Sequence, residues 1–213
     1  MIERATGIIL RTRPLTETSL IVNWLTPVLG RLSTVAKGAR RPKSPLRGKL
    51  DLFYEADFSF QRSRRSELHA LREVSLRETH APLRQEFGWL QQASHCAALI
   101  EQTTERETPL PAIFALMREL LAALPYRPPQ PQTIFAFELK LLDELGLTPD
   151  LNKSKLTPGT KLIAEKLAAL DWPALSRLQP SGTQSRELQQ FLHGFLIFHL
   201  GKVPGGRAAA LAL

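Results

Sequence analysis

Apolar residues in the first third of the chain occur in short runs or alternate with polar residues. Residues 52–60 alternate most clearly, and one face of this run carries Leu52, Tyr54, Ala56, Phe58 and Phe60. A period of two indicates a half-buried strand. We expect five strands, at residues 7–12, 19–25, 31–37, 52–60 and 67–76. Five short strands with no long helix among them favour a small closed barrel.

The fifth run alternates less regularly than the fourth. We expect its inward positions to be Leu68, Ala70, Val74 and Leu76, with Arg72 as an exception on the same face.

From Pro82 the apolar period becomes helical. We expect helices around the apolar stripes within residues 89–100, 113–124, 134–145, 158–170 and 188–198. The third of these is apolar on more than one side, which is typical of a helix at the centre of its domain. The last stripe contains Leu188, Phe191, Leu192, Phe195 and Phe198.

Positive charge is concentrated in the half of the chain that is expected to be β. The net charge is +8. Residues 1–80 carry 15 Lys and Arg against 8 Asp and Glu, whereas residues 81–213 carry 13 against 12. A basic half beside a nearly neutral half is typical of a polyanion-binding protein. Solubility alone does not require such clustering.

The strongest cluster lies between residues 31 and 49, which hold seven basic residues and no acidic residue. Lys and Arg on a loop rich in Gly, Pro and Ser can neutralise phosphates and release counterions. Together with two further basic turns, this run supplies our candidates for contacting nucleic acid: Arg11, Arg13, Arg31, Lys37, Arg40, Arg41, Lys43, Arg47, Lys49, Arg64 and Arg65. The alternative interpretation is a solvated flexible loop.

The sequence lacks the motifs of common enzyme classes. It has no Gly-x-Ser-x-Gly elbow, no His-Glu-x-x-His pair and no clustered acidic metal site. Its single cysteine, Cys96, lies on an apolar stripe and is expected in the core. We therefore expect no catalytic residue, no metal site and no cofactor. One cysteine and the absence of a membrane-length apolar run favour a cytosolic protein.

Several segments together resemble one known family, in the order that the family has them. The most specific is Val35-Ala36-Lys37-Gly38-Ala39-Arg40-Arg41. The others cover residues 6–14, 17–22, 25–27, 30–32, 137–142, 145–151, 156–159 and 199–201. Over nearly its whole length, the chain resembles the RecO family of DNA-repair and recombination mediators.

The resemblance implies an α+β multidomain protein, with an N-terminal OB-fold barrel over residues 1–79 and an all-helical domain over residues 80–213. Family members bind single- and double-stranded DNA and anneal complementary strands. They work with RecR and help load RecA onto DNA coated by single-stranded DNA-binding protein. Carried onto this chain, the family's DNA contacts are Arg11, Lys37, Arg40 and Arg41, whereas the other candidates rest on charge.

The sequence departs from the family in one place. Many members carry a four-cysteine zinc-binding insert after the Leu-Gly-x-x-Pro stretch. Here residues 150–156 lead directly to Pro158 and contain no cysteine. We interpret this as a deletion of the insert, which excludes a metal site at this place and argues against any function that the insert serves in relatives.

We therefore expect a non-catalytic mediator in the cytoplasm, associated with the nucleoid, with no membrane contact. Mobile basic loops would screen the repulsion between strands and leave the bases free to pair. The resemblance further implies that the acidic, apolar-ended tail of single-stranded DNA-binding protein docks on the helical domain, where an apolar groove between helices can accept a short amphipathic peptide. Possible basic residues at the rim of that groove are Arg118 and Lys140.

Two other functions remain open at this point. The first is a sequence-tolerant RNA-binding OB-fold protein, for which Trp24 and Phe53 are the nearest candidates for stacking on bases. The second is a nuclease or another phosphoryl-transfer enzyme, against which the lack of a clustered acidic metal site argues.

Overall fold

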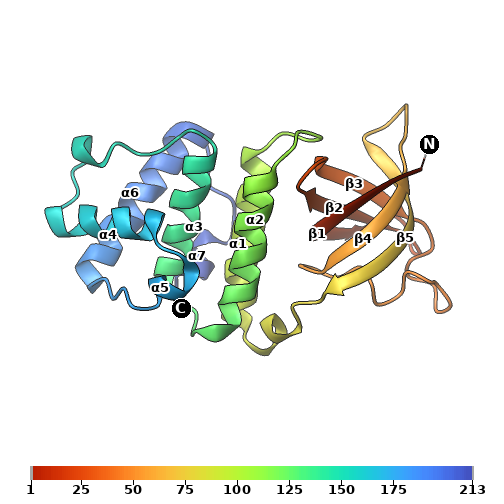
Figure 1. Cartoon of the computed structure of the whole chain (residues 1–213), viewed down its shortest axis with the longest axis horizontal. Helices are drawn as coiled ribbons and strands as arrows, with labels where there is room; N and C mark the ends of the chain where they lie inside the picture. Colours follow the sequence, from red (N-terminus) through yellow and green to blue (C-terminus); the bar gives the residue numbers. More distant parts are fainter. Residues whose placement is uncertain (1, 213) are drawn as a thin grey trace. The chain divides into compact units, whose positions relative to one another are not determined.

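The computed structural model describes residues 2–212 (Figure 1). Its strands are β1 (Ile2–Pro14), β2 (Leu20–Thr26), β3 (Gly30–Ala36), β4 (Glu55–Gln61) and β5 (Leu68–Glu78). Its α-helices are α1 (Phe87–Thr103), α2 (Pro111–Ala123), α3 (Pro131–Glu144), α4 (Pro158–Ala169), α5 (Trp172–Leu175), α6 (Gly182–Leu200) and α7 (Arg207–Leu211). Short 3-10 helices are η1 (Ala81–Gln85), η2 (Leu124–Tyr126) and η3 (Leu151–Lys153).

The chain forms two compact units. The first, which we call the barrel unit, comprises the residues up to Ala81 together with Thr104–Ala115. The second, the helical unit, comprises Pro82–Thr103 and Leu116–Leu213. Residues 104–115, which the sequence placed with the helices, thus group with the barrel.

The five strands close into a barrel in the order β1-β2-β3-β5-β4, as expected for an OB fold. Neighbouring strands are antiparallel except β3 and β5, which are parallel. β1 is long because it pairs with β4 through its first half and with β2 through its second half. A bulge between Ile9 and Arg11 interrupts its register with β2. Such a bulge bends the strand and increases its twist, which helps the sheet to close.

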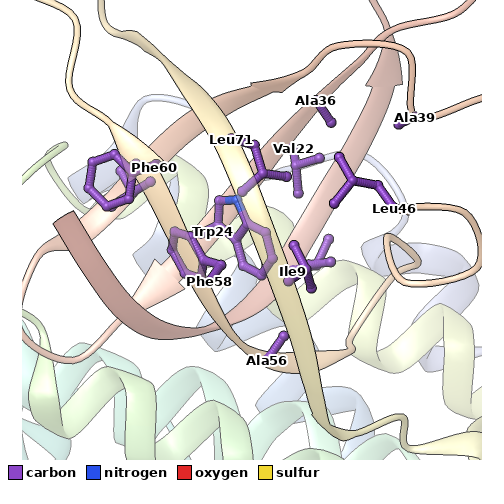
Figure 2. Close-up of a cluster of buried hydrophobic side chains, with 12 residues drawn as sticks. Ile9, Val22, Trp24, Ala36, Ala39, Leu46, Ala56, Phe58, Phe60 and Leu71 are labelled. Carbon is purple, nitrogen blue, oxygen red and sulfur yellow. The ribbon is translucent and has the colours of Figure 1, made fainter. Parts of the chain in front are cut away.

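The barrel core is built around stacked aromatic side chains (Figure 2). Trp24 and Phe58 stack with their ring centroids 4.0 Å apart, and the Trp24 Nε1–H donates a hydrogen bond to Thr34 Oγ1 at 2.9 Å. This bond satisfies the indole N–H, which would otherwise be costly to bury. Ala39 and Leu46, from the loop between β3 and β4, complete the same cluster.

The alternation of β5 changes phase at Arg72, which corrects the inward set expected from the sequence. His69 and Leu71 are buried in the first half of the strand, whereas Leu68 and Ala70 are half-buried. The pairing with β4 jumps from Phe60↔Leu71 to Ser59↔Glu73, so Arg72 is the extra residue of a β-bulge. An extra residue reverses which face the following side chains take. Arg72 therefore marks a register shift and not an irregular core position.

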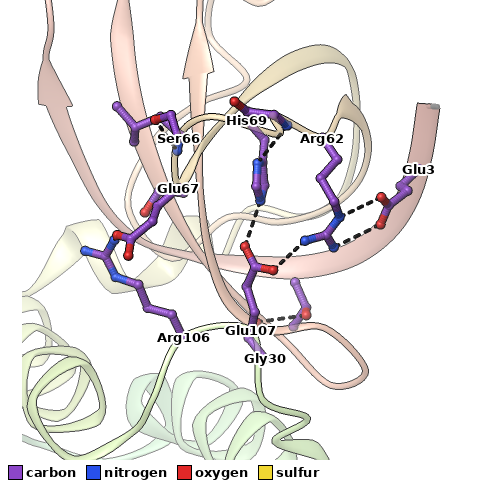
Figure 3. A network of polar contacts seen from close by, with 12 residues as sticks. Glu3, Gly30, Arg62, Ser66, Glu67, His69, Arg106 and Glu107 are labelled. Atoms are coloured by element: carbon purple, nitrogen blue, oxygen red, sulfur yellow. Dashed lines mark hydrogen bonds and ion pairs between the residues drawn. The ribbon is translucent and has the colours of Figure 1, made fainter.

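Residues 104–110 dock on the turn between β2 and β3 (Figure 3). The Glu107 N–H donates to the Arg31 carbonyl at 2.9 Å, and the Leu110 N–H donates to the Pro27 carbonyl at 3.1 Å. The approach is closest at Gly30, where an added Cβ would lie 1.8 Å from the Thr108 carbonyl oxygen. Only glycine fits there, because φ is also +64°.

Helix α3 lies at the centre of the helical unit, as the sequence predicted. It packs against α1, α4, α6 and α7, and its residues 133–139, 141 and 142 are buried. None of the helices in the described part of the chain combines the length and the apolar character that crossing a bilayer requires.

The buried ridge of α6 differs from the predicted stripe. Leu188, Leu192 and Leu196 point into the unit, whereas Phe191 and Phe195 are half-buried and Phe198 is 83% exposed. Residues four apart lie on one face of a helix, and Phe198 follows Leu196 by only two positions. The sequence predicted one stripe of large apolar residues at helical spacing. For Phe198 this prediction was wrong, because its side chain does not lie on the buried face of α6.

A carboxylate is completely buried inside the helical unit. Glu138 of α3 accepts two hydrogen bonds from the Arg207 guanidinium, at 2.7 and 2.8 Å, and lies 3.0 Å from His95 Nε2. Burial raises the pKa of Glu138, but the bonds from Arg207 and His95 outweigh it, so the pKa lies below its ordinary value. The ionised carboxylate thus stabilises the fold near neutral pH, and this contribution is lost as the pH falls through the lowered pKa.

We expect Arg207→Ala to destabilise the chain by about 3 to 5 kcal/mol at neutral pH, because it leaves a buried carboxylate without its main partner. The difference in the free energy of unfolding between variant and parent should shrink in acid, where Glu138 becomes protonated in both proteins. Urea denaturation followed by circular dichroism measures it, with the exposed Arg177→Ala as control. Equal stability of the Arg207 variant and the parent would contradict this assignment.

We expect Gly30→Ala to destabilise the barrel unit more than Gly48→Ala does. Both positions have positive φ, so alanine costs about 1 to 2 kcal/mol at either. Nothing lies within 4 Å of a Cβ added at Gly48, whereas at Gly30 the Thr108 backbone must move. Overpacking of this kind adds about 1 to 3 kcal/mol. Thermal unfolding of both variants provides the comparison, and equal losses would mean that residues 104–110 adapt freely.

Candidate nucleic-acid interface

The basic loop, defined here as residues 37–49, is fixed to the barrel. Ala39 and Leu46 are buried in the barrel core, at one end of the cluster shown in Figure 2. From Gly38 to Arg47 the backbone makes successive tight turns. In these turns the N–H groups of Arg41, Ser44 and Arg47 each donate to the carbonyl three residues earlier. The sequence predicted mobile basic loops, and in the structure two apolar residues of this loop pack in the barrel core.

The side chains of the basic loop fall into two kinds. Lys37, Arg40, Arg41, Lys43 and Arg47 are exposed. Lys49 is half-buried and donates from Nζ to the Val74 carbonyl at 3.1 Å, which ties the loop to β5. Anchoring by the apolar residues therefore holds five cations on the outside of the barrel, where they can meet phosphates.

The turn between β1 and β2 lies against the beginning of the basic loop. The Arg40 N–H donates to the Thr18 carbonyl at 3.0 Å, and the Gly38 N–H donates to Ser19 Oγ at 3.4 Å. Arg11 and Arg13 are exposed on the part of β1 that leads into this turn. Seven of the candidates thus lie on the basic loop or on the part of β1 that leads into the turn against it, and together we call them the basic end: Arg11, Arg13, Lys37, Arg40, Arg41, Lys43 and Arg47.

Arg64 and Arg65 are exposed on the turn between β4 and β5 and do not join the basic end. This turn follows Phe60, which lies at the opposite end of the core cluster from Ala39 and Leu46 (Figure 2). The Arg62 guanidinium carbon lies 5.8 Å from the centre of the Phe60 ring, which places the start of the turn there. Figure 1 likewise shows the two loops at opposite ends of the barrel.

Charges around the β4–β5 turn are largely paired (Figure 3). Arg62 binds both carboxylate oxygens of Glu3, at 2.7 and 3.0 Å, and also donates to Glu107. Hydrogen bonding to Glu3 raises the pKa of Arg62 and lowers that of Glu3. Arg106 pairs with Glu67 in the same region. Such ion pairs attract a polyanion less than the clustered, exposed cations of the basic end do.

Arg31 has a structural environment that the sequence did not indicate. Its Nε donates to Thr104 Oγ1 at 2.7 Å, and its guanidinium also bonds to the Thr104 carbonyl. The side chain therefore helps to hold residues 104–110 on the barrel. No sequence signal predicts this, because the partners are 73 positions apart.

The two aromatic residues considered for stacking on bases belong to the core. Trp24 is fully buried and Phe53 is 1% exposed. Phe53 also takes a positive φ of 64°, and its N–H donates to the Ile9 carbonyl at 2.8 Å. Neither ring can stack on a base in this structure, so as stacking candidates both were wrong.

The two basic residues suggested for a peptide groove differ in their surroundings. Arg118 is exposed on α2. Lys140 of α3 is half-buried, and its Nζ donates to the Ala168 carbonyl near the end of α4 at 2.7 Å. Burial lowers the pKa of Lys140. Lys140 thus links two helices, whereas Arg118 faces solvent.

The barrel unit also contains a cavity beside its strands. A cavity of about 920 Å³ borders β1, β4, β5 and the β2–β3 turn. Its lining includes both Arg4 and Lys49 and the acids Asp57 and Glu73, so it does not extend the cationic surface. Across residues 2–212, no three His, Cys, Asp or Glu side chains gather as a metal ion requires.

Comparison with known proteins matches both parts of the chain to one family. The model described as "Recombination protein O N terminal" matches residues 1–80, and "Recombination protein O C terminal" matches residues 90–157. Curated relatives named "DNA repair protein RecO" include those of Exiguobacterium sibiricum and Bacillus subtilis. Each is 30% identical over 71% of this chain.

The coverage of these relatives differs. The chain aligns with about 60% of the length of the Exiguobacterium and Bacillus proteins. A relative from Anaeromyxobacter sp. strain K, also named DNA repair protein RecO, is 28% identical over 93% of this chain and 92% of its own length. Matches to both halves, on a closed barrel followed by helices, show that the chain belongs to the RecO family of DNA repair and recombination proteins.

Proposed function

We propose that this protein is a recombination mediator that binds single- and double-stranded DNA and anneals complementary strands without catalysing bond chemistry. The observation that carries the proposal is the basic end, where five exposed cations lie on an anchored loop of an OB-fold barrel and two more lie on β1. Membership of the RecO family supports DNA as the polyanion.

The geometry favours recognition of the DNA backbone over recognition of its bases. Exposed Lys and Arg side chains release counterions when they meet phosphates, and this contribution does not depend on sequence. Because Trp24 and Phe53 are buried, they leave the bases of a bound strand unstacked and available for pairing. Screening of the phosphates while the bases stay accessible is what annealing requires.

The proposed partners are DNA, RecR and single-stranded DNA-binding protein, with RecA loaded indirectly. The protein would work in the cytoplasm at the nucleoid. We assign the acidic, apolar-ended tail of single-stranded DNA-binding protein to the helical unit, where the exposed Arg118 offers a charge and Lys140 contributes through its link to α4.

We expect Lys37→Glu combined with Arg40→Glu to weaken binding of unrelated DNA sequences alike. If both cations contact phosphates, the slope of log affinity against log salt should fall by about two contacts, or roughly 1.8 for duplex DNA. Fluorescence anisotropy over a salt series measures this. Lys202→Glu with Arg177→Glu makes the same charge change at two exposed residues of the helical unit and is the matched control.

An equal loss in both double variants would show that net charge, and not the basic end, governs binding. Unchanged affinity of the Lys37 and Arg40 variant at low salt would remove this loop from the interface. Tight binding of RNA together with weak binding of DNA of the same length would favour the RNA-binding alternative. Cleavage of DNA that depends on a divalent metal would favour the phosphoryl-transfer alternative.

We expect Arg118→Glu to weaken binding of the tail peptide of single-stranded DNA-binding protein to the whole chain by about tenfold or less, as for one exposed charge pair. Calorimetry with a synthetic peptide measures this. The Lys37 and Arg40 double variant should bind the peptide as the parent does. Loss of peptide binding in that variant alone would place the peptide on the barrel.

A further inference from the structure

The carboxylate of Glu107 occupies a small site that the barrel builds from two donors (Figure 3). Its Oε1 lies 2.9 Å from His69 Nε2, and its Oε2 accepts a bond from the Arg62 guanidinium. His69 is 2% exposed, and Arg62 is half-buried beside it. A guanidinium and an imidazole N–H that converge on two oxygens of one anion suit a phosphate group as well as a carboxylate.

Other contacts orient both donors without the help of Glu107. Arg62 is held by the carboxylate of Glu3, and its guanidinium lies near the face of the Phe60 ring. His69 stacks on Phe60 with ring centroids 5.3 Å apart. Its Nδ1 accepts a bond from the Ser63 N–H at 3.3 Å, which in the neutral ring leaves the proton on Nε2, facing Glu107. The site would therefore persist if Glu107 moved away.

The Glu107 side chain is more exposed than either donor that binds it, at 39% against 34% for Arg62 and 2% for His69. Residues 105–109 are exposed, and Glu107 has a φ of 54°, a left-handed conformation that non-glycine residues rarely adopt. Strain of this kind persists only while surrounding contacts maintain it. The same contacts hold the carboxylate in its charged form. Burial raises the pKa of Glu107, but the bonds from Arg62 and His69 lower it by more, so this pKa lies below its ordinary value.

We propose that Arg62 and His69 form a phosphate-binding site that Glu107 fills in the unbound protein and that a backbone phosphate of nucleic acid takes over. Arg64 and Arg65 follow Arg62 on the same exposed turn, so a strand entering the site would meet further cations. This inference rests on the proposed function. It adds a second contact with nucleic acid, at the end of the barrel opposite the basic loop. This contact stays closed until a phosphate displaces the Glu107 carboxylate.

Inorganic phosphate tests the site without DNA. In Glu107→Ala the site is vacant, so phosphate should raise the melting temperature of this variant above that in chloride of equal ionic strength, and more than in the parent. Glu67→Ala is the matched control, because it removes one carboxylate from the same region, the partner of Arg106, and leaves the site filled. Equal phosphate responses in the two variants would overturn the proposal.

DNA binding by the whole chain supplies a second readout. Glu107→Ala should bind DNA about three- to tenfold more tightly than the parent, with a salt slope steeper by about one phosphate contact. Glu67→Ala should gain less, and Arg62→Gln added to Glu107→Ala should cancel the gain. If the parent binds DNA but Glu107→Ala gains no more than Glu67→Ala, this inference fails and the proposed function stands.

The opposite outcome separates the two ideas as well. If no variant binds DNA but phosphate stabilises Glu107→Ala selectively, the anion site is real and the proposed function fails. If Arg62→Gln does not fold, His69→Gln in the Glu107→Ala background takes its place, since it removes the other donor. If phosphate stabilised the variant that lacks His69 as strongly as Glu107→Ala alone, His69 would not be a donor of the site, and this would contradict the proposal.

Discussion

The burial of Ala39 and Leu46 in the barrel core is the contact on which the candidate interface depends. A closed barrel of five strands leaves its ends to be covered by loops, and here the loop that contributes to one end also carries most of the exposed cations. Apolar burial stabilises by roughly 25 cal/mol for each Å² removed from water. Like charges on neighbouring residues repel one another, and this burial opposes their tendency to spread the loop.

The barrel divides its charge unequally between its two ends. At the basic end, the cations face solvent. The turn between β1 and β2 is joined to the basic loop by hydrogen bonds from the Arg40 N–H to the Thr18 carbonyl and from the Gly38 N–H to the Ser19 hydroxyl. At the other end, Arg62 is matched by Glu3 and Glu107, and Arg106 by Glu67. A cluster of exposed cations of one sign projects a longer-ranged field than ion pairs do, so a polyanion approaching the barrel is steered to one end first.

Local sequence patterns predicted the elements well, because strand and helix periods depend on nearby residues. The strand around Phe58 and the central position of α3 could both be read from spacing. Features that depend on distant residues could not. The bulge at Arg72 is defined by its partner strand, and the contact of Arg31 with Thr104 joins residues far apart in the chain.

For the candidate site, charge clustering identified the cations but not their grouping. Whether Arg64 lies beside Lys37 depends on which loops share an end of the barrel, and strand order decides that. One local pattern does indicate that the basic loop is anchored. Ala39 and Leu46 are apolar residues within a strongly basic run, and such residues indicate that a loop packs on the domain. Glu107 gave no signal, because its partners lie 38 and 45 positions away.

The anchored loop has a consequence for the thermodynamics of association. A disordered basic segment must lose backbone freedom when it binds, and that loss opposes complex formation. Here the tight turns at Arg41, Ser44 and Arg47 already hold the backbone. Ordering on contact with a polyanion is then confined to the long side chains and their ions. A surface of this kind is preorganised, so its affinity for the proposed polyanion would come chiefly from the entropy of released counterions, and little of that affinity would be lost to folding.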